Sequence, residues 1–80
     1  MAEQTELVLN NIKAILEASG SSLEQVLKVN IYLSDIAKKP EMNEVYKRFF
    51  PKAPPARIGM GGLQLDDGLD IEIDVIASCD

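Results

Sequence analysis

Arg57 and Glu72 are the residues whose types and spacing best suit chemistry on a small carboxylate. Arg57 follows a proline pair and precedes several glycines, and Glu72 lies 15 positions later (72 − 57) in a stretch of alternating apolar and polar residues. A guanidinium binds a carboxylate through two parallel hydrogen bonds, and a nearby carboxylate can orient or deprotonate a water molecule. The pair therefore suggests a site that holds a small carboxylate beside an activated water.

The elements around this pair are expected to bring the two side chains together. Asp66-Asp67-Gly68 is a strong turn signal, and the segments 58–65 and 69–77 on either side of it are interpreted as strands. If these strands pair as a hairpin, Arg57 and Glu72 approach one end of the sheet. The glycines of segment 58–65 also suggest a bulge, or a close approach of another backbone or a ligand.

A structural role for Arg57 is the alternative. The polar face of the last strand carries Asp70, Glu72 and Asp74, and like charges are costly to bury without a basic partner. Arg57 could simply form an ion pair with Glu72 or Asp74. From the residues alone this interpretation is favoured, because an arginine that faces acids across strands is commonplace. A carboxylate-binding site without turnover is a third interpretation.

The periodicity of the chain predicts the remaining elements. Residues 3–19 have apolar positions at helical spacing, residues 26–33 alternate like a strand, and Pro40 suits the first turn of a helix that Pro51 ends. The order is helix, strand, helix, strand, strand. Two helices can then cover one face of a mixed sheet, so we predict an α+β layer pair in one domain.

Apolar positions within these elements predict the core. The expected core faces consist of Val8, Leu9, Ile12, Ile15 and Leu16 in the first helix, Leu27, Val29, Ile31 and Leu33 in the first strand, Met42, Val45, Tyr46 and Phe49 in the second helix, and Leu69, Ile71, Ile73, Val75 and Ala77 in the last strand. The opposite face of the first strand is either solvated or part of an oligomer interface.

Composition excludes several classes of protein. The 80-residue chain carries a net charge of −5, which argues against nucleic-acid binding, and it has no histidine to support a zinc site or a catalytic thiol at Cys79. No apolar run is long enough to span a bilayer. Met1 is followed by Ala-Glu-Gln-Thr-Glu, which does not read as a signal peptide, so we expect a soluble cytoplasmic protein.

Four segments, taken in order, resemble the Rid family of reactive-intermediate deaminases, also called YjgF-like or L-PSP proteins. They are EQTELVLNNIKAILEASGSSLEQVLKVNIYL, NEVYKRFFP, PPAR and IEIDVIA. The resemblance covers nearly the whole chain. It implies a chorismate-mutase-like α+β fold that assembles as a trimer around a barrel, with ligand clefts between subunits.

The resemblance also implies roles for particular residues. Arg57 would grip the substrate carboxylate, Glu72 would position the attacking water, and Asn43 would lie near the cleft. The implied reaction is hydrolysis of 2-iminobutanoate or 2-iminopropanoate, or their enamine tautomers, to a 2-keto acid and ammonia, without a metal or an organic cofactor.

The chain departs from the family pattern at its start. The family's N-terminal strands, which carry a tyrosine and a Ser-Gly-Gln stretch that line the cleft, are missing, so residues 1–80 are interpreted as one partial domain. A three-stranded sheet with an exposed edge invites pairing with another chain. We therefore expect a homo-oligomer, with a trimer favoured, and a small carboxylate as the ligand.

Overall fold

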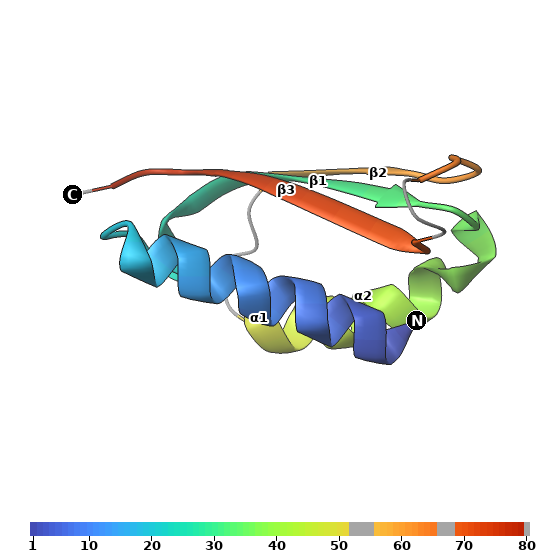
Figure 1. Cartoon of the computed structure of the whole chain (residues 1–80), viewed down its shortest axis with the longest axis horizontal. Coiled ribbons are helices and arrows are strands. Elements are labelled where there is room, and N and C mark those ends of the chain that lie inside the picture. The colour runs from blue at the N-terminus through green and yellow to red at the C-terminus, as the bar shows by residue number, and fades with distance from the viewer. Residues whose placement is uncertain (52–55, 66–68, 80) are drawn as a thin grey trace.

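The computed structural model describes residues 1–51, 56–65 and 69–79, and it contains two helices on one face of a three-stranded sheet (Figure 1). The proline pair before Arg57 and the expected turn at 66–68 lie outside the described residues. The elements, in chain order, are α1 (Ala2–Ala18), the short 3₁₀ turn η1 (Leu23–Gln25), β1 (Val26–Leu33), a second 3₁₀ turn η2 (Ile36–Lys38), α2 (Lys39–Phe49), β2 (Ala56–Met60) and β3 (Ile71–Ala77). The α+β architecture is therefore confirmed.

Local sequence explains where the helices begin and end. Helix α1 is followed by Gly20, whose φ of 83° is a left-handed conformation that suits glycine. Helix α2 has Pro40 in its first turn, as expected, and buries Met42, Val45 and Tyr46 against the sheet. Ile15 was expected in the core of α1 but is 65% exposed. Leu9, which was expected in the same core face, is fully buried.

The strand order is β2-β1-β3, so the expected hairpin between residues 58–65 and 69–77 is wrong. Strand β2 follows β1 through α2 and pairs with it in parallel, whereas β3 pairs antiparallel with the other edge of β1. A parallel partner needs a crossover connection, and α2 supplies it. After β2 the chain crosses the end of β1, where the Leu63 amide donates to the Leu33 carbonyl at 3.2 Å.

The central strand β1 separates the buried face of the sheet from an uncovered face. Val29, Ile31 and Leu33 are fully buried under the helices. Leu27 was expected beside them but is 61% exposed, because an irregularity in the pairing with β3 between Val26 and Lys28 shifts the alternation. Val26 takes the buried position instead, with 7% of its surface exposed.

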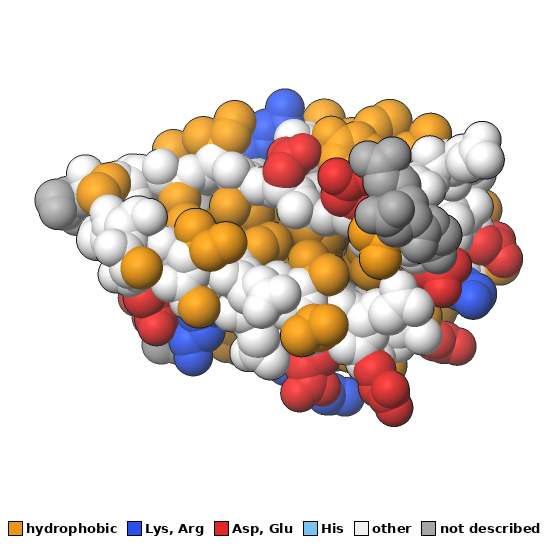
Figure 2. Space-filling view, viewed as in Figure 1, with side chains coloured by type: hydrophobic (Ala, Val, Ile, Leu, Met, Phe, Trp, Pro, Cys, Tyr) orange, Lys and Arg blue, Asp and Glu red, His pale blue; other side chains and the backbone are white. Residues whose placement is uncertain are grey.

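The face of the sheet away from the helices is partly apolar. It carries Lys28, Asn30 and Tyr32 from β1, flanked by Ala56, Ile58 and Met60 from β2 and by Glu72, Asp74 and Ile76 from β3. Ile58, Met60 and Ile76 are 47%, 43% and 57% exposed. Figure 2 shows hydrophobic atoms along the edge of the molecule that this face forms, and in the band between the sheet and α1. We call this surface the open face.

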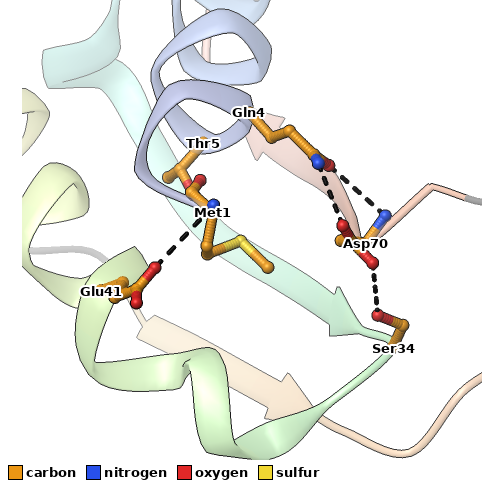
Figure 3. Close-up of polar contacts among 6 residues, drawn as sticks. All are labelled: Met1, Gln4, Thr5, Ser34, Glu41 and Asp70. Carbon is orange, nitrogen blue, oxygen red and sulfur yellow. Dashed lines mark hydrogen bonds and ion pairs between the residues drawn. The ribbon is translucent and has the colours of Figure 1, made fainter.

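A polar cluster ties α1 to the ends of β1 and β3 (Figure 3). The Gln4 amide donates to one Asp70 carboxylate oxygen at 3.0 Å, and the Ser34 hydroxyl donates to the other at 3.0 Å. These two hydrogen bonds, and then the charge of Lys38, hold the pKa of Asp70 below its usual value. The cluster fixes the start of β3 against the first turn of α1.

The close packing around Gly61 explains why one of the positions after Arg57 is a glycine. A Cβ built on Gly61 would lie 2.9 Å from the Ile36 Cα and would overlap the Ile36 side chain, so the chain after β2 packs directly on η2. The expected close approach of another backbone is therefore confirmed here. None of the helices in the described part of the chain is long and apolar enough to cross a membrane.

Candidate functional site

Strand β2 places Arg57 on the face of the sheet that the helices cover. Arg57 lies opposite Val29 in the parallel pairing of β2 with β1, and opposite residues of neighbouring strands project to the same face. β2 is an edge strand whose residues are all exposed. The Arg57 side chain therefore reaches toward α2 at the rim of the sheet while it keeps contact with solvent.

Two residues of α2 hold the guanidinium group. Arg57 Nη1 donates a 2.7 Å hydrogen bond to Asn43 Oδ1, and Arg57 Cζ lies 4.8 Å from the centroid of the Tyr46 ring. Asn43 and Tyr46 are three positions apart, so they occupy the same face of the helix. The structure thus joins two of the residues that the sequence singled out, Arg57 and Asn43, and adds Tyr46, which we had assigned only to the core.

Glu72 lies on the opposite face of the sheet. It pairs with Tyr32, which is three residues beyond Val29 and so projects to the open face. With strands about 4.8 Å apart and a rise of about 3.3 Å per residue, the Cα atoms of Arg57 and Glu72 are roughly 14 Å apart. Within one chain the structure therefore does not bring these two side chains to a common site.

Asp74 of β3, and Asp70 just before this strand, have other neighbours than Arg57. Asp74 accepts a 2.8 Å hydrogen bond from the Asn30 amide, and Asp70 belongs to the cluster with Gln4 and Ser34. None of the ion pairs among the described residues involves Arg57. The ion pair of Arg57 with Glu72 or Asp74, which was the structural interpretation, is absent from the described part of the chain.

Tyr32 is the neighbour of Glu72 that sequence reasoning did not single out. Partial burial, and then the adjacent carboxylates of Asp74 and Glu72, raise the pKa of the Tyr32 phenol above its ordinary value. The phenol therefore stays protonated at neutral pH and can donate a hydrogen bond. Its alternation with Val29 and Ile31 already placed it on the polar face, but nothing in its spacing connected it with Glu72.

Among the residues that the structure describes, no group of side chains is suited to hold a metal ion. Across residues 1–51, 56–65 and 69–79, no three His, Cys, Asp or Glu side chains form a group that could hold one. What the arrangement offers is an exposed arginine whose charge is not neutralised by a described carboxylate. Such a group is suited to bind an anion, above all a planar carboxylate.

Comparison with known proteins establishes the family. The family model described as "Endoribonuclease L-PSP" matches residues 1–79. A RutC family protein of Pyrococcus horikoshii is 48% identical over 75 residues, which cover 94% of this chain and 60% of that protein. The chain belongs to the L-PSP family, also called the YjgF or RutC family. The resemblance noted in the sequence is thereby confirmed.

Other members of the L-PSP family support both the sequence match and the fold. Protein HMF1 of Saccharomyces cerevisiae is 45% identical over 78 residues, covering 98% of this chain and 60% of HMF1. The crystal structure of yeast YEO7 superposes with a TM-score of 0.97 at 44% identity, covering 100% of this chain and 64% of that one. The structure of Escherichia coli TdcF with bound serine gives a TM-score of 0.92 at 32% identity, covering 99% of this chain and 65% of TdcF.

The match covers nearly all of this chain but only part of each relative. The chain spans about three fifths of the length of the curated relatives it matches most strongly. The relatives also differ in compartment, since one of them is the mitochondrial protein mmf2 of Schizosaccharomyces pombe. Membership of the family therefore does not by itself assign a compartment to this chain.

Proposed function

We propose that this chain binds small 2-imino acids through Arg57 and hydrolyses them to 2-keto acids and ammonia. The observation that carries the proposal is the state of Arg57, which Asn43 and Tyr46 hold without an ion-pair partner among the described residues. The E. coli relative TdcF has bound serine, an amino acid that presents a carboxylate as a 2-imino acid does. An arginine of this kind is suited to that shared carboxylate.

The proposed chemistry needs little beyond positioning. The carbon of the C=N bond is already electrophilic, so a held carboxylate and a placed water supply most of the acceleration. Glu72 is the proposed general base, worth about 10²–10⁴-fold. It accepts a proton from the water as the C–O bond forms and passes this proton to the imine nitrogen, which gives a carbinolamine. The proton of the new hydroxyl then moves through Glu72 to the same nitrogen as the C–N bond breaks and the C=O bond forms. Ammonia leaves and a 2-keto acid remains, and no metal or organic cofactor takes part.

For Arg57 and Glu72 to act on one small ligand, they must come from different copies of the chain. Arg57 and Glu72 project from opposite faces of one sheet, so no small ligand can touch both within a single chain. The open face carries the exposed apolar residues Ile58, Met60 and Ile76, which favours its burial against a neighbouring copy. We propose that a homo-oligomer, with a trimer favoured, brings Glu72 of one copy to Arg57 of the next.

A coupled assay tests the enzymatic proposal. Hydrolysis of 2-iminobutanoate by the 80-residue chain should exceed the uncatalysed rate and should fall to that rate in Arg57→Ala and in Glu72→Ala. Circular dichroism checks that both variants remain folded. A folded wild-type oligomer that does not accelerate the hydrolysis would contradict the enzymatic proposal.

Non-catalytic carboxylate binding is the second candidate function. It is favoured by the distance between Arg57 and Glu72 within one chain, because the described residues complete a binding group but not a reactive pair. In that case a small carboxylate binds, Arg57→Ala abolishes binding, and no turnover is seen. The name of the family model points instead to ribonuclease activity, but the net charge of −5 disfavours an RNA partner. A cytoplasmic location remains a prediction.

A further inference from the structure

The ring of Tyr46 makes a cation–π contact with the guanidinium of Arg57. Tyr46 is 4% exposed, and its ring centroid lies 4.8 Å from Arg57 Cζ. The ring is held in turn by Phe50, since the two ring centroids are 4.7 Å apart and the planes are inclined by 33°. A buried, braced ring gives the charged group a fixed surface on which to rest.

Asn43 and Tyr46 together restrict how Arg57 can present its donors. A guanidinium carries five N–H donors in one plane, and Asn43 accepts from Nη1. Arg57 Cζ lies over the Tyr46 ring, 4.8 Å from its centroid. A carboxylate that binds through two parallel hydrogen bonds must lie in the plane of the guanidinium, at an edge that Asn43 does not occupy. Asn43 therefore limits which edge of the guanidinium a carboxylate can use, and the contact with the ring limits how far the guanidinium can turn.

The ring rather than the hydroxyl of Tyr46 is suited to this role. The hydroxyl oxygen is buried and has no hydrogen-bond partner among the described residues. Burial raises the pKa of this phenol, and the charge of Arg57 opposes that shift in part. A neutral phenol keeps the ring as an uncharged π surface. A buried hydroxyl without a partner destabilises the fold, so its removal should be tolerated.

We propose that Tyr46 is a positioning residue that holds Arg57 ready for a carboxylate, an inference that rests on the proposed carboxylate site. Long arginine side chains lose rotamer freedom when they bind a ligand, and a group that is already ordered loses less. The contribution of a cation–π contact at an exposed site corresponds to roughly a two- to fivefold change in affinity. Tyr46 acts through Arg57 and does not itself contact the ligand.

Calorimetric titration with 2-oxobutanoate, a stable 2-keto acid, tests the proposal. Tyr46→Phe should bind as tightly as the wild type, because it keeps the ring. Tyr46→Leu should bind roughly two- to fivefold more weakly. Val45→Ala is the matched control, since Val45 is also a buried residue of α2, whereas the contacts that hold Arg57 come from Asn43 and Tyr46. It should lower stability to a similar degree and leave affinity unchanged. Tyr46→Met replaces Tyr46→Leu if the latter does not fold.

Nuclear magnetic resonance of the wild type gives an independent readout. The Nε–H group of Arg57 should be more ordered than that of Arg48, an exposed arginine of the same helix α2 that carries Tyr46. Equal mobility of the two groups would overturn the inference. So would wild-type affinity in Tyr46→Leu while Arg57→Ala has lost binding, a result that leaves the carboxylate site itself intact. If the wild type does not bind, or if Arg57→Ala binds equally well, the proposed function fails and the inference with it.

Discussion

Asn43 Oδ1 accepts a 2.7 Å hydrogen bond from Arg57 Nη1 and so ties helix α2 to the edge strand β2. A neutral amide in this place orients the guanidinium without neutralising its charge. A carboxylate in the same place would form an ion pair and would compete with a ligand for Arg57. The choice of an amide is therefore what a binding site requires, whereas a purely structural contact would be served equally well by an acid.

Asn43→Asp separates these two roles. We expect the variant to be as stable as the wild type or more stable by about 0–1 kcal/mol, since an exposed ion pair contributes little. Its affinity for 2-oxobutanoate should nevertheless fall by about fivefold or more, because the new carboxylate occupies Arg57. Thermal melts and calorimetric titration measure the two quantities. Unchanged affinity in Asn43→Asp would argue that Arg57 does not hold the ligand.

The Asp70 cluster predicts a dependence of stability on acid. The pKa of Asp70 is lowered in the folded protein by Gln4 and Ser34, so its contribution is fully present above the unfolded value of 3.8 and is lost as pH falls through the folded pKa. Asp70→Asn should therefore be less stable than the wild type at neutral pH. The difference between the two should shrink below about pH 4 and vanish in stronger acid. Melts from pH 2 to 7 follow it, with Glu6→Gln, a change at an exposed residue of α1, as the control for charge. A difference that stays constant across this range would contradict the assignment.

Gly61 and Gly59 form a matched pair for a packing prediction. A Cβ at Gly61 would meet the backbone of Ile36 at 2.9 Å, so Gly61→Ala should destabilise the fold by about 1–3 kcal/mol. At Gly59 the nearest atoms are the Lys39 Cε and Nζ at 4.0 Å, so Gly59→Ala should change stability by no more than about 0.5 kcal/mol. Urea denaturation measures both. Equal effects of the two substitutions would show that the chain after β2 does not pack on η2 as described.

The open face predicts a site of association. Ile76→Lys places a charge among exposed apolar side chains and should dissociate the proposed homo-oligomer. Leu7→Lys is the matched control, because Leu7 is 62% exposed on α1, away from the open face, and the oligomer should persist. Sedimentation velocity at micromolar concentration measures both. A wild-type chain that sediments as a folded monomer would refute the association.

The sequence predicted the layers of this fold better than the partners of its strands. The spacing of Met42, Val45 and Tyr46 and the alternation of Val29 with Ile31 reflect burial, and burial is local enough to be seen in a pattern. β3 pairs with the edge of β1 that β2 does not occupy. The position of β2 depends on the connection through α2, and a local sequence pattern does not reveal it. The turn signal at 66–68 therefore suggested a hairpin where the sheet has β1 between the two strands.

The candidate site was likewise predictable only in part. Arg57 and Asn43 were named from the motifs PPAR and NEVY, and the structure joins them. Tyr46 was missed as a neighbour of Arg57 because an aromatic at a helical core position usually serves packing alone. The separation of Arg57 from Glu72 could not be anticipated. It follows from the strand order, and from the fact that their partners on β1 project to opposite faces of the sheet.

A complementation assay tests most directly whether a functional site forms between two copies of the chain. Arg57→Ala and Glu72→Ala, each inactive alone, are unfolded together, refolded at equal concentration and assayed with 2-iminobutanoate. If Arg57 of one copy works with Glu72 of another, about a quarter of the sites in the mixed oligomers regain both residues, and activity returns in proportion. Activity that stays at the level of the separate variants, while the wild type treated in the same way is active, would contradict a site shared between copies.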